Sequence, residues 1–301
     1  MEADRFEVDL RYGAFVLRQT DLSVTDGVAV PLTRTYTSQD WGSPSHDHAF
    51  GLYSTHNWDI APTGTRRPYT YLNLMLPDSD FLAFERISPG TGYADAVYLH
   101  SETSTPFYKA TIAWNGDGWT LREADGSEMR FPEAYASKNL AQGAAYVVKD
   151  GAGRVIQLQR DNQRNLHEIR TEHGHWIRFA YDADARITQA EDDAGEFVRY
   201  GYNNDGLLAW ALRSSGQERT YEYENKLLTG VLNEKGTVLV RNVYRSGILV
   251  RQDFANGESY AYSYEPATPG HFMEQVIVTL PDQTEKEIRV GDTVPAFLRV
   301  P

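Results

Sequence analysis

Residues 174–182 read GHWIRFAYD, and the same pattern returns 21 residues later, at 195–203, as GEFVRYGYN. Further copies follow, because both a glycine and a tyrosine recur at this spacing. The glycines are Gly153, Gly174, Gly195, Gly216, Gly236 and Gly257; the tyrosines are Tyr181, Tyr202, Tyr223, Tyr244 and Tyr264, with Arg160 in the same position one period earlier. Two series that keep the same period of 20–21 residues indicate a repeat architecture.

Each repeat reads as two strands joined by two turns. The first turn contains the glycine, and Asn256-Gly257 is the strongest of these turns, since Asn-Gly favours a type I′ hairpin with positive φ at both central residues. The next strand alternates, with Ile177 and Tyr181 on one face and Arg178 on the other. The second turn follows the tyrosine. We therefore predict an all-β chain containing a curling antiparallel array of β-hairpins, in which each hairpin is stabilised by its neighbours.

The tyrosines of these strands share one face of the predicted sheet and are the candidate ligand-binding or packing residues. They are Tyr181, Tyr200, Tyr202, Tyr221, Tyr223, Tyr244 and Tyr262. Aromatic rings pack well on the apolar faces of sugars, but periodic aromatic residues usually mark a packed core. We expect a packing face, with sugar binding as the alternative.

The composition excludes several classes of function. The 301 residues carry a formal net charge of −13, which disfavours nucleic acid as a partner, and the absence of Cys rules out disulfides and thiolate chemistry. No apolar run reaches the length of a membrane span, and no phosphate loop, dinucleotide fingerprint or nucleophile elbow is present. We therefore expect no cofactor and no enzyme activity. The N-terminus does not resemble a signal peptide, so we expect either another export route or a longer polypeptide.

Two groups of side chains could in principle hold a metal ion. His46-Asp47-His48, together with His56, offers imidazole ligands, but the preceding Ser43-Pro44-Ser45 indicates a loop, and we expect surface histidines. Glu191-Asp192-Asp193 with Glu196 offers carboxylates, but it falls in a predicted hairpin turn, where such residues are usually solvated. His173 and His175 flank another hairpin glycine and are expected to be exposed. We predict no metal site.

The Tyr-Asp pair at Tyr181-Asp182, with its copies, resembles the YD repeats of Rhs proteins. An N-terminal string supports this resemblance separately. It comprises Val8-Asp9-Leu10, Gly13-Ala14-Phe15, Thr20-Asp21-Leu22, residues 31–38 (PLTRTYTS), Phe50-Gly51 and Asn57-Trp58, and residues 121–131 resemble the bridge into the repeats. The Asp is replaced by Asn203, Glu224, Arg245 and Glu265 in other copies, so the repeat is interpreted as architectural. No C-terminal toxin is visible.

The resemblance implies a β-rich N-terminal Rhs-type domain at 1–140, five to six YD repeats at 141–265, and C-terminal strands at 266–301 that continue the array. Residues 273–280 and 287–290 are the candidate strands there. It also implies a structural shell segment of a secreted or cell-surface bacterial protein associated with a toxin. Its partners would be the rest of a longer polypeptide or an enclosed polypeptide. A carbohydrate-binding module with exposed aromatics and a β-scaffold glycosidase or polysaccharide lyase are the alternatives; the last requires two converging carboxylates.

Overall fold

A computed structural model of the chain describes residues 4–39, 49–77, 80–102, 105–134, 140–265, 273–290 and 297–300. The predicted all-β fold is confirmed, because within these ranges the chain forms antiparallel strands and one short 3-10 helix, η1 (Leu140–Gly143). None of the described segments forms a helix long and apolar enough to cross a membrane. His46, Asp47 and His48 lie outside the described residues.

Five strands form a small sheet in the order β26-β1-β2-β3-β4. They are β1 (Arg5–Asp9), β2 (Ala14–Thr25), β3 (Ala29–Thr37), β4 (Ser54–His56) and β26 (Phe297–Val300). We call this the inner sheet. β1 to β4 pair in chain order, and β26 forms one edge of the sheet, where Val300 pairs with Phe6 of β1.

The remaining strands form one long sheet, the outer sheet, in which successive strands of the chain pair antiparallel. Its first part comprises β5 (Ala61–Gly64), β6 (Tyr71–Met75), β7 (Phe81–Arg86), β8 (Val97–Leu99), β9 (Thr111–Trp114), β10 (Gly118–Arg122), β11 (Glu128–Pro132) and β12 (Val147–Lys149). The repeats supply β13 (Val155–Arg160), β14 (Leu166–Thr171), β15 (Trp176–Tyr181), β16 (Ile187–Asp192), β17 (Phe197–Tyr202), β18 (Leu208–Arg213), β19 (Glu218–Glu224), β20 (Leu227–Asn233), β21 (Val238–Arg245), β22 (Ile248–Phe254) and β23 (Ser259–Glu265). β24 (Gln275–Thr279) and β25 (Glu285–Arg289) follow.

The domain limits that we predicted do not coincide with the sheets. Residue 140 falls inside the outer sheet, because β11 before it pairs with β12 after it. The C-terminal strands also divide, since β24 and β25 continue the array whereas β26 leaves it to pair with β1. The chain is therefore organised as an inner sheet from its two ends and an outer sheet from its middle.

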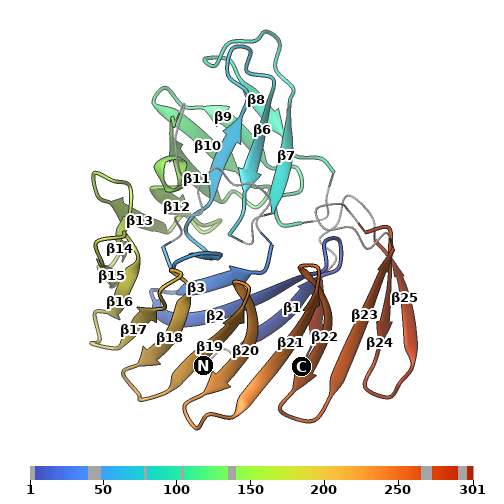
Figure 1. Ribbon diagram of the computed structural model, residues 1–301. Coiled ribbons are helices and arrows are strands. Elements are labelled where there is room, and N and C mark those ends of the chain that lie inside the picture. Colours follow the sequence, from blue (N-terminus) through green and yellow to red (C-terminus); the bar gives the residue numbers. More distant parts are fainter. Residues whose placement is uncertain are drawn as a thin grey trace.

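The inner sheet lies across the repeat array (Figure 1). β2 contacts β15, β16, β17 and β22, and buried side chains of both sheets form one hydrophobic cluster. Phe50, in the turn before β4, also packs its ring edge-on against Tyr200 of β17, at 4.9 Å between centroids. Burial of apolar surface between the two sheets stabilises the contact between the repeat array and the inner sheet.

The glycine turns are three-residue loops rather than the type I′ turns that we predicted at Asn256-Gly257. In that turn Gly257 donates to the carbonyl of Phe254, and Phe254 donates to the carbonyl of Glu258. Among the loop residues, Gly257 has positive φ (86°) and Asn256 does not. A type I′ turn needs positive φ at both central residues, whereas a three-residue loop needs it at the last one, where glycine stands in each repeat.

The second turn explains why the Asp of the Tyr-Asp pair can be replaced. The Oδ1 atom of Asp182 accepts the main-chain N–H groups of Asp184 and Arg186, and Asn203 makes the same pair of bonds with its amide oxygen. Where Glu224 stands instead, the loop shortens to two residues, Asn225 and Lys226, both with positive φ. The same happens after Arg245, where Ser246 and Gly247 form the turn. An Asp or Asn thus stands where the turn has three residues, and neither is required where the turn is type I′.

In four of the repeats the tyrosine binds the preceding repeat. Its hydroxyl donates to a main-chain carbonyl about 15 residues earlier. The pairs are Tyr181 with Leu166 (2.8 Å), Tyr202 with Ile187 (2.6 Å), Tyr223 with Leu208 (2.9 Å) and Tyr244 with Leu228 (3.0 Å). Arg160 takes the tyrosine position one period earlier and donates its Nε–H to the carbonyl of Ala145 at 3.1 Å.

Main-chain bonds also join the two sheets, and glycines permit the close approach. Ile187 donates to the carbonyl of Ala49 (2.7 Å), and Leu249 donates to the carbonyl of Gly13 (2.9 Å). Leu52 donates to the carbonyl of Gly206 at 3.0 Å. A Cβ atom added to Gly51 would lie 2.3 Å from that same carbonyl oxygen, so no larger residue fits there without displacing the backbone.

Candidate functional site

The structure places the predicted tyrosine face against the inner sheet. Tyr200, Tyr221 and Tyr262 are buried, and each hydroxyl has a polar partner in the core. Tyr200 donates to Asp21 at 2.8 Å, Tyr221 to Gln19, and Tyr262 to Gln252 at 2.8 Å. Tyr181, Tyr202, Tyr223 and Tyr244 are the half-buried residues that bind the preceding repeat. The seven tyrosines therefore do not present exposed rings to a sugar.

A buried charged network lies where Tyr200 and Tyr221 meet the inner sheet. Arg34 donates to both carboxylate oxygens of Asp21 (3.0 and 3.3 Å), to Gln19 (2.9 Å) and to the Tyr221 hydroxyl (3.0 Å). Burial acts to lower the pKa of Arg34, but the charges of Asp21, Tyr221 and Tyr200 and the hydrogen bond to Asp21 together hold that pKa well above its ordinary value. Burial, followed by the charge of Asp21, raises the pKa of the Tyr200 hydroxyl. The network therefore joins the inner sheet to the tyrosine face through buried hydrogen bonds.

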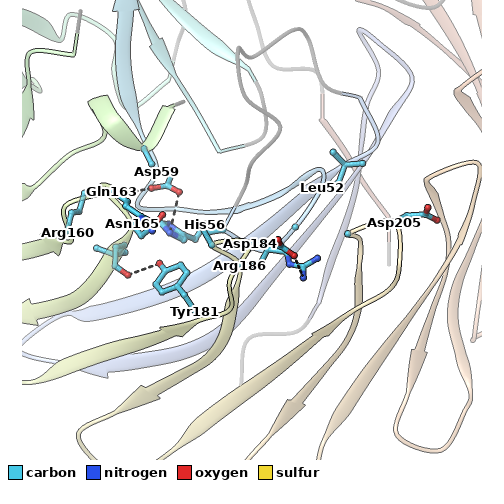
Figure 2. Close-up of a pocket in the computed structure, with 16 residues that line it drawn as sticks. Leu52, His56, Asp59, Arg160, Gln163, Asn165, Tyr181, Asp184, Arg186 and Asp205 are labelled. Atoms are coloured by element: carbon cyan, nitrogen blue, oxygen red, sulfur yellow. Dashed lines mark hydrogen bonds and ion pairs between the residues drawn. The ribbon is translucent and has the colours of Figure 1, made fainter. Parts of the chain in front are cut away.

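A cavity of about 450 Å³ lies nearby, between the N-terminal segment and the second turns of three repeats (Figure 2). It is lined by Ala49, Gly51, Leu52, His56, Asp59, Ala141, Arg160, Gln163, Asn165, Leu166, Tyr181, Asp184, Ala185, Arg186, Asp205 and Gly206. The walls come from segments more than 100 residues apart in sequence, because the inner sheet and the repeats approach each other here. Polar side chains of both sides, among them His56, Asp59 and Arg160, converge on it.

The deep end of the cavity holds His56, Asp59 and Arg160. Asp59 accepts from Arg160 Nη1 at 3.0 Å and lies 3.3 Å from His56 Nε2, while Arg160 Nη2 donates to the carbonyl of Trp58 at 2.9 Å. His56 Nδ1 accepts the main-chain N–H of Trp58 at 3.3 Å, so Nε2 carries the proton that faces Asp59. Our expectation of a surface histidine at His56 is wrong, since 1% of it is exposed.

Burial is the main reason that the pKa of His56 falls below its ordinary value, with the charge of Asp59 opposing this and that of Arg160 adding to it. The imidazole is therefore neutral at pH 7 and serves as a packed, hydrogen-bonded core residue. It stacks on Phe179 at 6.3 Å and meets Phe50 edge-on at 6.2 Å. Such a ring is positioned by its neighbours on every side, and its polar atoms are used within the protein.

The mouth of the cavity carries charged residues from the turns. Arg186 donates to Asp182 through Nε (2.8 Å) and to Asp184 through Nη2 (2.9 Å), and its guanidinium lies over the ring of Tyr202. Asp205 is exposed at the next turn. These contacts stabilise the turns. Across the described residues, no group of three or more His, Asp or Glu side chains could hold a metal ion.

The other predicted clusters are turn residues. Asp192 is buried, and its Oδ1 accepts the N–H groups of Ala194 and Glu196, as Asp182 does in the second turn. Glu191 accepts from Gln189 at 3.0 Å, so the acidic run is spread over a hairpin. His173 and His175 are exposed, as expected, and the Nδ1 atom of each lies at hydrogen-bond distance from a carboxylate: His173 from Asp26 (2.7 Å) and His175 from Asp193 (2.8 Å).

Sequence patterns did not identify the charged side chains that are buried between the two sheets, which are Asp21, Arg34, Asp59 and Arg160. One signal was available, since Arg160 occupies the tyrosine position of the repeat and an unusual residue at a repeated position indicates a local partner. Nothing in the spacing of Asp21 and Arg34 shows that they meet. That pairing depends on β2 lying beside β3 and on both lying under the array.

Comparison with models of protein families gave no match, and comparison with curated protein sequences gave none. Solved structures do match. The crystal structure of TcdB2-TccC3 without its hypervariable C-terminal region is 12% identical with a TM-score of 0.37, over 98% of this chain and 16% of that chain. TcdB2-TccC3-TEV is 13% identical with a TM-score of 0.35, over 94% of this chain and 16% of that chain.

A Photorhabdus luminescens Tc holotoxin pore with a mutated TccC3 is 12% identical with a TM-score of 0.35, over 94% of this chain and 16% of that chain. The chain thus spans less than a fifth of the length of the structures that it matches. These identities and TM-scores place the chain in no family; they record a similarity along nearly all of its length to parts of Tc toxin proteins.

Proposed function

We propose that this chain is a non-catalytic scaffold segment, an arc of hairpin repeats that is closed on its inner side by its own N-terminal sheet. The observation that supports this most is the docking of the inner sheet on the tyrosine face. Main-chain bonds at Ile187, Leu249 and Gly206 lie along the contact, together with the buried pair of Arg34 and Asp21. Contacts that are spread over several repeats stabilise the array as a whole.

The charged groups of the interior support the same function. Asp59 is held by Arg160 and His56, and Asp21 is held by Arg34 and Tyr200. A glycosidase or lyase needs carboxylates that are free to exchange protons with a substrate in a cleft. Carboxylates that are committed to buried arginines instead hold segments together, as a scaffold requires.

The resemblance to YD-repeat Rhs proteins supplies the proposed setting, which is a toxin-associated bacterial polypeptide that is secreted or held at the cell surface. The partners would be the rest of that polypeptide and any segment that it encloses. The inner sheet covers β15 to β17 and β22, so an enclosed segment would contact other parts of the shell.

Two measurements test this proposal. Hydrogen exchange on the purified chain should show the amides of Ile187 and Leu249 exchanging as slowly as the centres of β17 and β19, because the inner sheet protects them. Fast exchange at these two amides would show that the inner sheet does not close the array. Immunoblots of fractionated source cells should find the segment in the extracellular or surface fraction, and release of sugars from a polysaccharide panel by the pure chain would contradict a non-catalytic role.

A further inference from the structure

Outside the repeats, a cluster of aromatic side chains runs from the core of the outer sheet to its surface. Trp119 is fully buried, whereas 48% of Tyr93 is exposed. The centroids of Trp119 and Trp114 are 5.2 Å apart, and those of Trp114 and Tyr93 are 4.9 Å apart. Tyr69 closes the group, 5.8 Å from Tyr93 and 6.2 Å from Trp119. Core packing accounts for Trp119, but it gives no reason for an exposed ring at Tyr93.

The loop that carries Tyr93 is held in one conformation by Arg86. The Arg86 side chain, of which 7% is exposed, donates to the carbonyls of Tyr69 (2.9 Å), Gly92 (2.6 Å) and Pro89 (3.0 Å), and to Asp95 Oδ1 (3.2 Å). These four hydrogen bonds fix the conformation of the short surface loop that carries Tyr93. Preorganisation of this kind lowers the entropy that a binding surface loses when a ligand arrives.

The rings also have a defined mutual geometry. The planes of Tyr93 and Trp114 meet at 67°, and those of Tyr93 and Tyr69 at 60°. Such angles form a corner rather than a flat surface. A corner fits a single chain of linked sugar rings, whereas a flat aromatic surface suits a layered or crystalline polysaccharide.

We propose that Tyr93 and Trp114 form a binding site for a single chain of an uncharged polysaccharide. Aromatic rings pack against the apolar C–H face of a pyranose, and the carboxylate of Asp95, whose side chain is 58% exposed, can accept sugar hydroxyls beside them. The net charge of −13 disfavours acidic polymers. This site is separate from the tyrosine face of the repeats, whose rings are covered by the inner sheet.

The test is affinity electrophoresis of the purified chain through gels that contain a neutral glucan, mannan or galactan, with calorimetry on any polymer that retards it. We expect retardation by at least one neutral polymer, and a loss of about tenfold in affinity for Tyr93→Ala, the equivalent of one aromatic contact. Tyr93→Phe should bind like the unmodified chain, because the ring is kept. Tyr108→Ala is the matched control, since Tyr108 is an exposed tyrosine (44%) outside the cluster.

An acidic polysaccharide and a proline-rich peptide complete the panel. Binding of a neutral polymer that is lost in Tyr93→Ala and kept in Tyr93→Phe and Tyr108→Ala supports the site. The proposal is overturned if no neutral polymer binds, if only the acidic polymer or the peptide binds, or if Tyr93→Ala binds as well as the unmodified chain. Thermal unfolding of each variant shows whether a loss of binding comes from a loss of fold.

Discussion

The hydroxyl of Tyr202 donates to the main-chain carbonyl of Ile187 at 2.6 Å, and this bond joins two consecutive repeats. The bond recurs with the period of the sequence, at Tyr181, Tyr223 and Tyr244. It explains why the tyrosine of the repeat keeps its identity while the residue after it varies. Phenylalanine would fill the same space, but it could not satisfy the carbonyl of the preceding repeat.

Tyr223→Phe should therefore lower stability. The change removes the donor to the carbonyl of Leu208 and leaves a buried acceptor unpaired, which costs about 1–2 kcal/mol. Tyr264→Phe is the matched control, because within the described part of the chain the Tyr264 hydroxyl has no hydrogen-bond partner, although it is buried. Urea denaturation should show a lower midpoint for Tyr223→Phe and no decrease for Tyr264→Phe. Equal losses for both variants would contradict the proposed fastening.

The repeat and its strand pattern could be predicted from sequence because both depend on local spacing. The faces assigned in the first of these strands agree with the structure, since Arg178 is exposed, Ile177 is buried and Tyr181 is half-buried. The turn types could not be derived as well, since Asn256-Gly257 fits two hairpin loops and only the number of residues between paired positions distinguishes them. The role of the tyrosine hydroxyl was also out of reach, because its acceptor is a main-chain carbonyl that any residue can supply.

Arg34→Met should be strongly destabilising, because it leaves the carboxylate of Asp21 buried without its counter-charge. Breaking a buried ion pair in this way typically costs about 3–5 kcal/mol. The double change Arg34→Met with Asp21→Leu should recover part of that loss, since no lone charge remains in the core. Arg251→Met removes an exposed pair with Asp253 and should leave the unfolding midpoint unchanged. If the double variant is less stable than the sum of its single changes, the pair is not the source of the loss.

His56 illustrates what sequence reasoning could not provide about the interior. Its neighbours in the chain, Asn57 and Trp58, belong to the N-terminal string that resembles Rhs proteins. The string itself does not show which part of the fold these two side chains contact. Both side chains donate to the carbonyl of Pro31, and this fixes the segment on β3. Arg160 then donates a hydrogen bond to Asp59, from which it is separated by 101 positions in the sequence. Long-range pairs of this kind follow from the docking of the two sheets, which no local pattern encodes.

The pKa of His56 gives a prediction for pH. Because its folded pKa lies below its ordinary value of 6.5, the unfolded chain binds the proton more readily, and the stability that neutral His56 contributes is present above pH 6.5. That contribution is lost as the pH falls from 6.5 toward the depressed folded pKa, with a slope of at most about 1.4 kcal/mol per pH unit. Denaturation between pH 8 and pH 5 should show this slope, and His56→Gln should reduce it. An unchanged slope in His56→Gln would assign the effect to other groups.

The close approach of the two sheets at Gly51 can be separated from the backbone conformation of that residue. Gly51 has φ +78° and no space for a Cβ atom, because the carbonyl oxygen of Gly206 would lie 2.3 Å away. Gly195 has φ +83° with nothing within 4 Å, so Gly195→Ala carries the strain of positive φ alone, about 1–2 kcal/mol. Gly51→Ala should cost more than Gly195→Ala and should also speed hydrogen exchange at Ile187, whose amide is bound by Ala49 two residues before Gly51. Gly195→Ala should leave that amide protected, because its turn lies at the far end of β16 and β17. If both variants lose the same stability and Ile187 stays protected in both, the inner sheet does not depend on this contact for its docking.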